Sequence, residues 1–215
     1  MLEVKNLYLN YIKEYSALCN INLVLEDKEK IALIGDNDSG KTSLIRCICG
    51  LEKFNKGEIY INKINVKKIN FKKDVNLVYL SSNPVFFNNK TVYYNLAYPL
   101  KLRNFPLELI NQKINRAVDS LGIEGLKETK IKHLSQAEKQ IVNIARSLLR
   151  EANIYLIDDI FAFDMETNKK IAKVLVDNIN PDANVIFAID NQNSYLCPYL
   201  NISKEYHISN GYIEK

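Results

Sequence analysis

One short stretch limits what this chain can fold into more than any other part of its sequence. The apolar run 31–34 ends at Gly35, and after four residues come Gly40, Lys41 and Thr42, followed by an amphipathic segment. A G-x-x-x-x-G-K-[ST] pattern between a buried-type strand and a helix predicts a phosphate-binding loop, because backbone N–H groups and the helix N-terminus would point at the anion. A chance glycine turn is the weaker interpretation, since strand and helix patterns flank the motif on the correct sides.

Each part of this loop has an expected role. Lys41 would reach the β- and γ-phosphates of a nucleotide, and Thr42 would ligate Mg²⁺. A second metal ligand is expected at Asp158, which ends the apolar run 154–157 and is followed at once by Asp159. Without the loop, an acidic pair after a strand would more simply form a turn or a helix cap. The predicted nucleotide-binding residues of the loop are Gly35, Asp36, Asn37, Asp38, Ser39, Gly40, Lys41, Thr42 and Ser43.

Hydrophobic patterning predicts a parallel sheet around the loop. Strands are expected at 21–25, 31–34, 58–61, 75–80, 154–157 and 185–189. Three of these runs are almost wholly apolar up to a glycine or aspartate, which is typical of strands buried on both faces of a parallel sheet. One helix is expected from Pro106 with Gly122 as its C-terminal stop, and a second over 135–151. A hairpin is expected to turn at Asn210-Gly211.

Composition narrows the possible classes of protein. With 47% hydrophobic residues and no Pro/Gly/Ser-rich linker, residues 1–215 are expected to form a single domain. The formal charge of +4 is spread over isolated lysines, so nucleic acid is not an expected partner. No apolar run is long enough to cross a bilayer, and we expect an intracellular chain. The four cysteines are expected to be small buried hydrophobes: Cys19, Cys47, Cys49 and Cys197.

At the level of several motifs together, the chain resembles the ATP-binding cassette of ABC transporters over its full length. The segment 133–159, HLSQAEKQIVNIARSLLREANIYLIDD, is similar without a gap to the family's signature helix and the Walker B strand that follows it. Asp158 falls on the metal-binding aspartate. The resemblance implies an α/β P-loop NTPase with a mostly parallel core sheet, an N-terminal antiparallel β subdomain and an α-helical subdomain inserted at about 84–148.

The resemblance also implies roles for aromatic residues. Tyr11 would stack on adenine, although an ordinary strand tyrosine would fit its position as well. Phe86, Phe87, Tyr93 and Tyr94 lie where the family docks its membrane partner, but core packing explains aromatic residues there equally well. The segment 95–106 is more similar to importer than to exporter cassettes, and the direction of transport stays open.

Partners follow from the resemblance in the same way. In this family two cassettes sandwich two ATP molecules, and each site combines the phosphate loop of one chain with the signature of the other. Ser135 would therefore face the ATP of a second cassette. The expected partners are that cassette and a membrane-spanning transporter subunit, which would hold the chain at the cytoplasmic, inner face of the cell membrane.

The catalytic positions depart from the family pattern. Ser82 stands where the family has a glutamine, and its side chain is too short to reach water and metal. Asp159 replaces the general-base glutamate and keeps the carboxylate at a shorter reach. Asp190 replaces the switch histidine, so that a donor to the γ-phosphate becomes a like charge. Asp38 stands where a glycine is common in the phosphate loop, and aspartate tolerates left-handed backbone.

The signature itself is altered as well. Gln136 and Ala137 replace its two glycines, and Glu138 replaces its final glutamine. Ser135 and Glu138 form a capping-box pattern, so the helix is expected to form. Glu138 would either face the γ-phosphate, at a cost on the order of a few kcal/mol, or fold back on the Ser135 N–H.

Two functions remain open at this point. The first is an ATP-hydrolysing transporter subunit with slow turnover, in which Lys41 and Asp159 are the catalytic residues and ATP and Mg²⁺ are bound. The second is an ATP-binding structural or regulatory subunit without useful hydrolysis. The retained loop and carboxylates favour the first, and the changes at Ser82, Asp190 and the signature favour the second.

Overall fold

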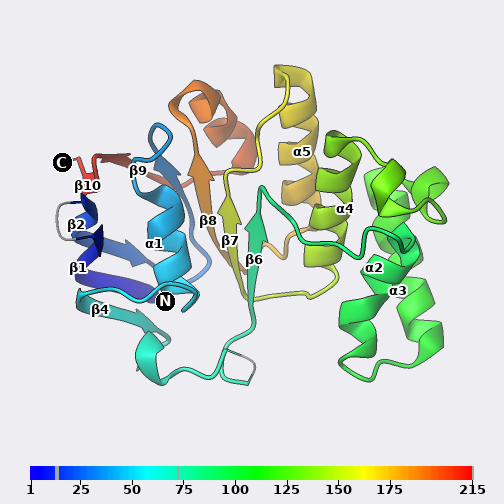
Figure 1. Ribbon diagram of the computed structural model, residues 1–215, viewed down its shortest axis with the longest axis horizontal. Helices are drawn as coiled ribbons and strands as arrows, with labels where there is room; N and C mark the ends of the chain where they lie inside the picture. The colour runs from blue at the N-terminus through cyan, green and yellow to red at the C-terminus, as the bar shows by residue number, and fades with distance from the viewer. Residues whose placement is uncertain (13–14, 72, 215) are drawn as a thin grey trace.

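Two β-sheets occupy one part of the molecule and a group of helices forms the other (Figure 1). The computed structural model describes residues 1–12, 15–71 and 73–214. The strands are β1 (Leu2–Ile12), β2 (Tyr15–Leu25), β3 (Lys30–Ile34), β4 (Lys56–Ile61), β5 (Ile64–Asn65), β6 (Leu77–Ser81), β7 (Ile154–Asp158), β8 (Asn184–Ile189), β9 (Lys204–Ser209) and β10 (Tyr212–Ile213). The α-helices are α1 (Lys41–Ile48), α2 (Val92–Lys101), α3 (Leu107–Leu121), α4 (Gln136–Leu148) and α5 (Met165–Asn178). The 3-10 helices are η1 (Val66–Lys68), η2 (Glu124–Leu126), η3 (Ile131–His133) and η4 (Asn191–Leu200).

The sheets confirm the expected fold class. One is antiparallel and N-terminal, with the order β2-β1-β4-β5. The other has the order β10-β9-β3-β8-β7-β6 and is parallel except for the β9–β10 pair. Every residue of β7 and β8 is buried, as the continuous apolar runs predicted. The β9–β10 hairpin turns at Asn210-Gly211, both with positive φ, which confirms the expected turn.

The carboxyl ends of the parallel strands gather the polar residues of the sequence motifs. In the ladders, Ser81 pairs with Asp158, and Ile34 pairs with Ile189. The residues that follow β3 and β8, Gly35 and Asp190, therefore leave the sheet side by side. Ligands in open parallel sheets bind at this edge, which makes it the place to look for a site.

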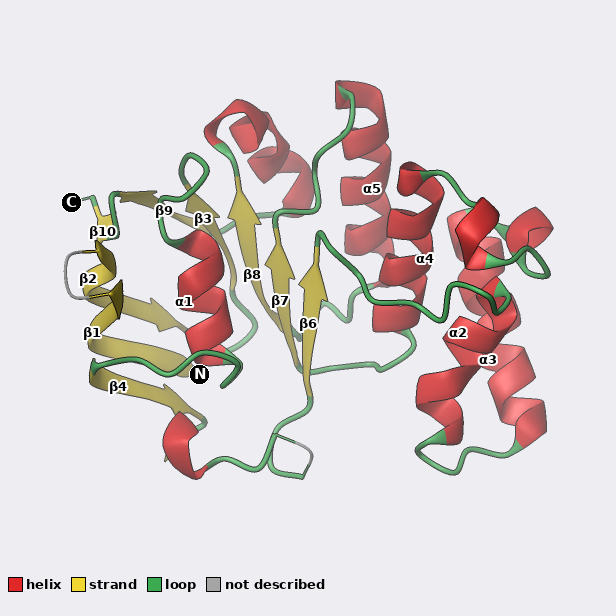
Figure 2. Ribbon diagram, viewed as in Figure 1, coloured by secondary structure: helices red, strands yellow, loops and turns green. Residues whose placement is uncertain are grey.

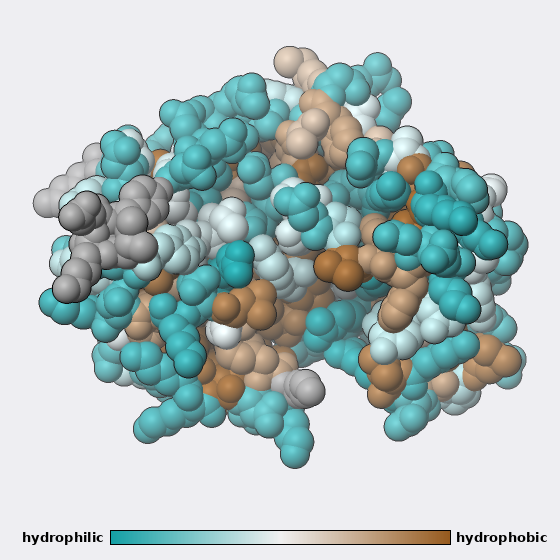
Figure 3. Space-filling view, viewed as in Figure 1, coloured by the Kyte–Doolittle hydropathy of each residue, from teal (hydrophilic) through white to brown (hydrophobic). Residues whose placement is uncertain are grey.

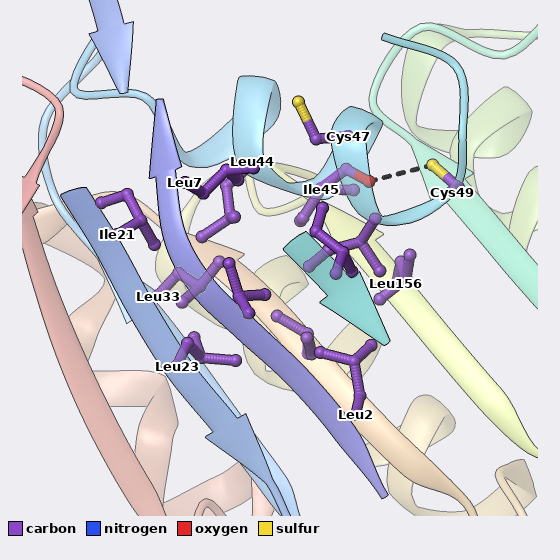
Figure 4. Close-up of a cluster of buried hydrophobic side chains, with 14 of the residues drawn as sticks. Leu2, Leu7, Ile21, Leu23, Leu33, Leu44, Ile45, Cys47, Cys49 and Leu156 are labelled. Atoms are coloured by element: carbon purple, nitrogen blue, oxygen red, sulfur yellow. Dashed lines mark hydrogen bonds between the residues drawn. The ribbon is translucent and has the colours of Figure 1, made fainter. Parts of the chain in front are cut away.

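Helix α1 is sandwiched between the two sheets. Figure 4 shows its apolar side chains with those of the antiparallel sheet and with Leu156 of β7 in one buried cluster. Three cysteines are buried as expected, namely Cys47, Cys49 and Cys197, and the Cys49 thiol donates to the Ile45 carbonyl at 3.0 Å. Cys19 is only partly buried, because it lies on a strand of the antiparallel sheet with one face near solvent.

A separate core joins α2, α3 and α4, away from the antiparallel sheet (Figure 2). Gly122 ends α3 in the left-handed conformation, as expected, with φ 63°. The helix begins one residue later than predicted, since Pro106 has an extended ψ of 144° and is the N-cap. Figure 3 shows a notch between the sheet part and this helical part, with apolar side chains beside it. No helix in the described ranges is long and apolar enough to cross a membrane.

Candidate functional site

The loop between β3 and α1 follows the predicted pattern, and its glycines are required by the packing of the protein itself. A Cβ at Gly35 would lie 2.2 Å from the Ile208 carbonyl oxygen of β9. A Cβ at Gly40 would lie 2.7 Å from the Ala17 carbonyl oxygen of β2, and Gly40 has φ 110°. Asp38 has φ 62°, which confirms that aspartate accepts the left-handed position here. The loop is thus pressed against β2 and the β9–β10 hairpin, and only its outer side is free.

The N-terminus of α1 is open to an anion. Its N-cap is Gly40, no side chain of the described residues caps it, and its first turn contains no acidic residue. The buried Ser39 hydroxyl has no hydrogen-bond partner among the described residues, which fits a group that a phosphate oxygen would satisfy. Loop and helix start therefore suit phosphate.

Lys41 is tied down by three oxygen atoms. Its Nζ donates to the carbonyl oxygens of Gly35 at 2.6 Å and Asp36 at 2.8 Å, and to Asp190 Oδ1 at 3.1 Å. The side chain of Lys41 is 4% exposed and that of Asp190 is 15% exposed. An ammonium group has three protons to donate, so every one of them already has an acceptor. A phosphate that needs Lys41 must replace or share one of these acceptors.

The two predicted metal ligands lie together at the sheet edge. The Thr42 hydroxyl donates to Asp158 Oδ1 at 2.8 Å, and Asp158 is 3% exposed. A second hydroxyl, from Tyr79 on β6, donates to Asp158 Oδ2 at 2.7 Å. Burial and the Asp158 carboxylate raise the pKa of Tyr79, so it stays a hydroxyl donor at neutral pH. One hydroxyl and one carboxylate next to a phosphate loop fit Mg²⁺, which binds few protein ligands and shares itself with phosphates.

Asp159 follows Asp158 in a left-handed conformation with φ 56°, and its N–H donates to the Ala188 carbonyl at 3.3 Å. The two carboxylates have different surroundings: Asp158 contacts Thr42 and Tyr79, whereas Asp159 lines the cavity beside the loop. Burial raises the pKa of Asp159, the neighbouring Asp190 and Asp158 carboxylates raise it further, and the Lys41 ammonium opposes them. A raised pKa makes a carboxylate a stronger base once it is ionised.

A cavity of about 380 Å³ joins the loop to the antiparallel sheet. It is lined by Tyr11, Ala17, Asp159 and the loop residues from Asn37 to Ser43. Tyr11 is 50% exposed, and its hydroxyl lies 3.1 Å from Ser43 Oγ. The structure thus brings Tyr11 to the phosphate loop with its ring accessible.

Ser82 lies directly after β6, at the same edge. Its N–H donates to the Asp158 carbonyl at 3.1 Å and so extends the ladder between β6 and β7. The Asn83 side chain donates to Ser82 Oγ at 3.4 Å. The hydroxyl thus interacts locally, as expected for a short side chain at this position.

Ser135 belongs to a different surface, at the start of α4. The predicted capping box is confirmed: Ser135 Oγ accepts from the Glu138 N–H at 3.2 Å, and Glu138 Oε2 accepts from both the N–H and the hydroxyl of Ser135 at 2.8 Å. These bonds hold the pKa of Glu138 below its usual range. Of the two orientations considered from the sequence, the structure has the one in which Glu138 folds back.

The four aromatic residues of the expected docking region have different surroundings. Phe86 lies under the Arg146 guanidinium at 4.5 Å, and the Tyr93 hydroxyl donates to Asn111 at 2.6 Å, so both belong to the packing of the helical part. Phe87 and Tyr94 instead meet edge to face at 5.5 Å and form a cluster with Tyr98 that is partly exposed.

Sequence reasoning missed two of these contacts. Asp190 was expected only to repel a γ-phosphate, and its ion pair with Lys41 was not foreseen. Tyr79 lies within the expected strand 75–80 and was given no role of its own. Its place near Asp158 follows from the register in which Ser81 pairs with Asp158, and the sequence does not show that register.

The sequence is similar to those of known ATP-binding proteins. Residues 18–162 match the profile of the family described as "ABC transporter". The oligosaccharides import ATP-binding protein MsmX of Bacillus subtilis is 32% identical over 74% of this chain and 43% of its own length. The methionine import ATP-binding protein MetN of Clostridium tetani is 30% identical over 88% of this chain and 60% of its own length. The chain thus spans about half the length of these relatives.

Solved structures show the same fold. The structure of cbiO1 from Clostridium perfringens, described as part of the ABC transporter complex cbiONQ, superposes with a TM-score of 0.83 at 23% identity, covering 100% of this chain and 86% of that chain. A dimeric structure of the ATP-binding cassette MJ0796 bound to ADP and Pi superposes with a TM-score of 0.85 at 22% identity, covering 100% and 97%. Together with the family profile, these likenesses lead to one conclusion: the chain belongs to the ABC transporter family and has the fold of its ATP-binding cassettes.

Proposed function

We propose that this chain binds Mg-ATP and hydrolyses it slowly as the ATP-binding subunit of an import system. The observation that carries the proposal is the meeting of three parts at one sheet edge. These are the uncapped start of α1, the Thr42–Asp158 pair at 2.8 Å, and Asp159 on the wall of the same cavity. An anion site, a place for a hard cation and a carboxylate base are the parts that phosphoryl transfer to water requires.

The phosphates would lie on the loop from Gly35 to Ser43, with Lys41 as the charged donor. Tyr11 would cover the adenine, because its ring borders the same cavity. Thr42 and Asp158 would hold Mg²⁺, which when bound neutralises phosphate charge. Asp159 would accept the proton of the attacking water on its carboxylate.

Two features support slow turnover. Asp159 has one methylene less than a glutamate. A general base must first lie within hydrogen-bond distance of the attacking water, and only then does its pKa matter. Asp190 holds one of the three protons of Lys41 and places a carboxylate beside the loop. The first feature weakens proton abstraction from the attacking water. The second weakens the stabilisation of negative charge in the transition state, because it occupies a donor of Lys41.

The partners are proposed from the relatives. The named relatives are import ATP-binding proteins, and one solved neighbour is a dimer. We expect a second cassette whose ATP would be approached by Ser135, and a membrane-spanning subunit that keeps the chain at the inner face of the cell membrane. The partly exposed cluster of Phe87, Tyr94 and Tyr98 supports a protein contact on the helical part.

The second candidate is an ATP-binding subunit without useful hydrolysis. The observation that favours it is the closed start of α4, where Glu138 already takes the donors of Ser135. A signature whose Ser135 donors are already occupied would give the partner's ATP fewer contacts and would weaken the composite site.

Steady-state ATP hydrolysis, measured with the membrane partner present, separates the two candidates. Slow hydrolysis that falls about 10² to 10⁴-fold in Asp159→Asn supports the first. Asp182→Asn is the matched control, because the Asp182 carboxylate is exposed and pairs with Lys28 at the surface. Turnover by Asp159→Asn equal to that of the wild type would favour the binding-only subunit.

Restoring substitutions make the test sharper. Asp159→Glu should raise turnover if the reach of the carboxylate is limiting. Asp190→His combined with Glu138→Gln should raise turnover further, the first by removing negative charge beside the loop and the second by weakening the hold of Glu138 on the Ser135 donors. Effects greater than additive are expected, because the groups would serve one transition state. Background rates in every combination would leave only the binding function.

A further inference from the structure

Both oxygens of the Asp158 carboxylate have a hydroxyl donor. Thr42 takes Oδ1 at 2.8 Å, and Tyr79 takes Oδ2 at 2.7 Å. Asp158 is 3% exposed, so water cannot easily replace either donor. Thr42 belongs to the phosphate loop, whereas Tyr79 comes from β6, a strand at the edge of the sheet.

The register of β6 and β7 explains why the tyrosine reaches the carboxylate. Ser81 pairs with Asp158 and Tyr79 pairs with Leu156, so Tyr79 is the diagonal neighbour of Asp158. Side chains two residues apart on a strand share a face, and an aromatic side chain spans the diagonal distance. Tyr79 and Leu156 both pack against the cluster on the α1 side of the sheet, where Asp158 and Thr42 also meet.

We propose that Tyr79 is a positioning residue for the metal, one that fixes the Asp158 carboxylate in the orientation in which it meets Thr42. This inference rests on the proposed Mg-ATP site and deepens it. The Tyr79 hydroxyl does not touch the cation. It donates to Oδ2 of the Asp158 carboxylate, the oxygen that Thr42 does not contact, as outer-shell partners do in other metal sites.

The arrangement has a physical advantage for a buried carboxylate. A desolvated anion needs donors on both oxygens, and one donor alone would leave it free to rotate away from the loop. With Thr42 and Tyr79 on opposite oxygens, the position of Asp158 is set before any nucleotide arrives. A preset ligand loses less conformational freedom when the cation binds.

Tyr79→Phe tests the inference because it removes one oxygen atom and keeps the ring in the core. The probe is a fluorescent non-hydrolysable ATP analogue, with its dissociation constant measured in Mn²⁺ and in EDTA. The ratio of the two constants reports how much the metal strengthens nucleotide binding. We expect Tyr79→Phe to reduce this ratio about tenfold while the constant in EDTA stays within about twofold of the wild type.

Tyr155→Phe is the matched control. Tyr155 is a buried tyrosine on the neighbouring β7. It packs in the cluster on the other side of the sheet, and its hydroxyl accepts a hydrogen bond from the Ala152 N–H at 3.0 Å. If the Tyr79 hydroxyl only stabilises the fold, both variants should melt at a lower temperature than the wild type. The ratio of the two dissociation constants should then be unchanged in Tyr79→Phe and in Tyr155→Phe. The Mn²⁺ resonance spectrum of the ternary complex gives a second readout, which should change in Tyr79→Phe alone.

An unchanged ratio in Tyr79→Phe, or an equal decrease in Tyr155→Phe, overturns the positioning role and leaves the proposed function standing. A wild-type protein that binds the analogue neither in Mn²⁺ nor in EDTA overturns the proposed function, and this inference with it.

Discussion

The N-termini of α1 and α4 both present free backbone N–H donors, but side chains cap these donors only at α4 among the described residues. Helix α1 starts at Gly40 with no side-chain cap and no acidic residue in its first turn. Helix α4 starts at Ser135 with a complete capping box, and Glu138 lies in its first turn. A helix N-terminus attracts negative charge in either case, but at α4 the protein supplies that charge itself.

The difference teaches which helix can receive an external anion. At α1 the Lys41 ammonium is paired with the Asp190 carboxylate at 3.1 Å, and the Asp158 carboxylate accepts from the Thr42 hydroxyl of the first turn. At α4 the Glu138 carboxylate stands alone on the Ser135 donors. Side chains at the N-cap and in the first turn therefore decide whether the N–H donors of a helix start can bind an external anion or are already capped by the protein.

Removing the cation at α1 should have the largest effect. Lys41→Ala should weaken Mg-ATP binding on the order of 100-fold, because charge-assisted hydrogen bonds to phosphate are the strongest single contacts available there. Calorimetry measures the affinity, with the exposed Lys28→Ala as the control. A thermal melt is needed beside it, since the variant leaves Asp190 without its ion pair. A loss of less than about tenfold would contradict an open phosphate site at α1.

Removing the competing carboxylate should have the next largest effect. Asp190→Asn keeps the shape of the side chain and frees Lys41 from an internal anion, so ATP affinity should rise about tenfold, or roughly 1.4 kcal/mol. ADP should gain less, because it has no γ-phosphate to take the place of Asp190. Fluorescent nucleotide titrations of both ligands check this, with Asp182→Asn as the charge-matched control. Equal or lower ATP affinity would mean that Asp190 does not compete for Lys41.

Breaking the cap of α4 should cost stability and leave nucleotide binding by the isolated chain unchanged. Ser135→Ala removes the N-cap hydroxyl, which typically costs about 1 kcal/mol, or a melting temperature about 2 to 4 °C lower in a domain of this size. Scanning calorimetry gives the shift. No shift at all would show that the cap does not stabilise the folded chain.

The smallest expected effect is a pH dependence at the same cap. The Ser135 N–H and hydroxyl lower the pKa of Glu138 below its ordinary value of 4.5, so the folded state binds the proton less tightly than the unfolded state. The stabilisation is therefore complete above the ordinary pKa and is lost as the pH falls through the lowered one. The melting difference between the wild type and Glu138→Gln should be constant near neutral pH and shrink in acid. A difference that grows in acid would have the wrong sign for this cap.

Much of the fold could be predicted because its signals are local. The runs that became β7 and β8 are apolar throughout, Gly122 stops α3, and Asn210-Gly211 turns the last hairpin. The start of α3 was misplaced by one residue, because a proline can stand at the cap or in the first turn with the same fixed φ.

The candidate site was predictable only in part. The spacing within 35–42 and the carboxylates at the end of β7 identified most of the polar groups that the structure gathers at one edge. The pairing of Lys41 with Asp190 was not visible, since these residues are 149 positions apart and the sequence does not state the strand order. Partner choice within a sheet depends on how several strands pack, so no local pattern encodes it.

Sequence by itself determined the phosphate loop, the capping box of α4 and the apolar strands, because each depends on residues that follow one another within a single turn or strand. Tertiary structure alone decided what those elements do to each other. The order β3-β8-β7-β6 brings Asp190 to Lys41 and Tyr79 to Asp158, and the close approach of β9 denies Gly35 a side chain. Contacts between distant segments follow from packing and register, and these are properties of the whole chain rather than of any stretch within it.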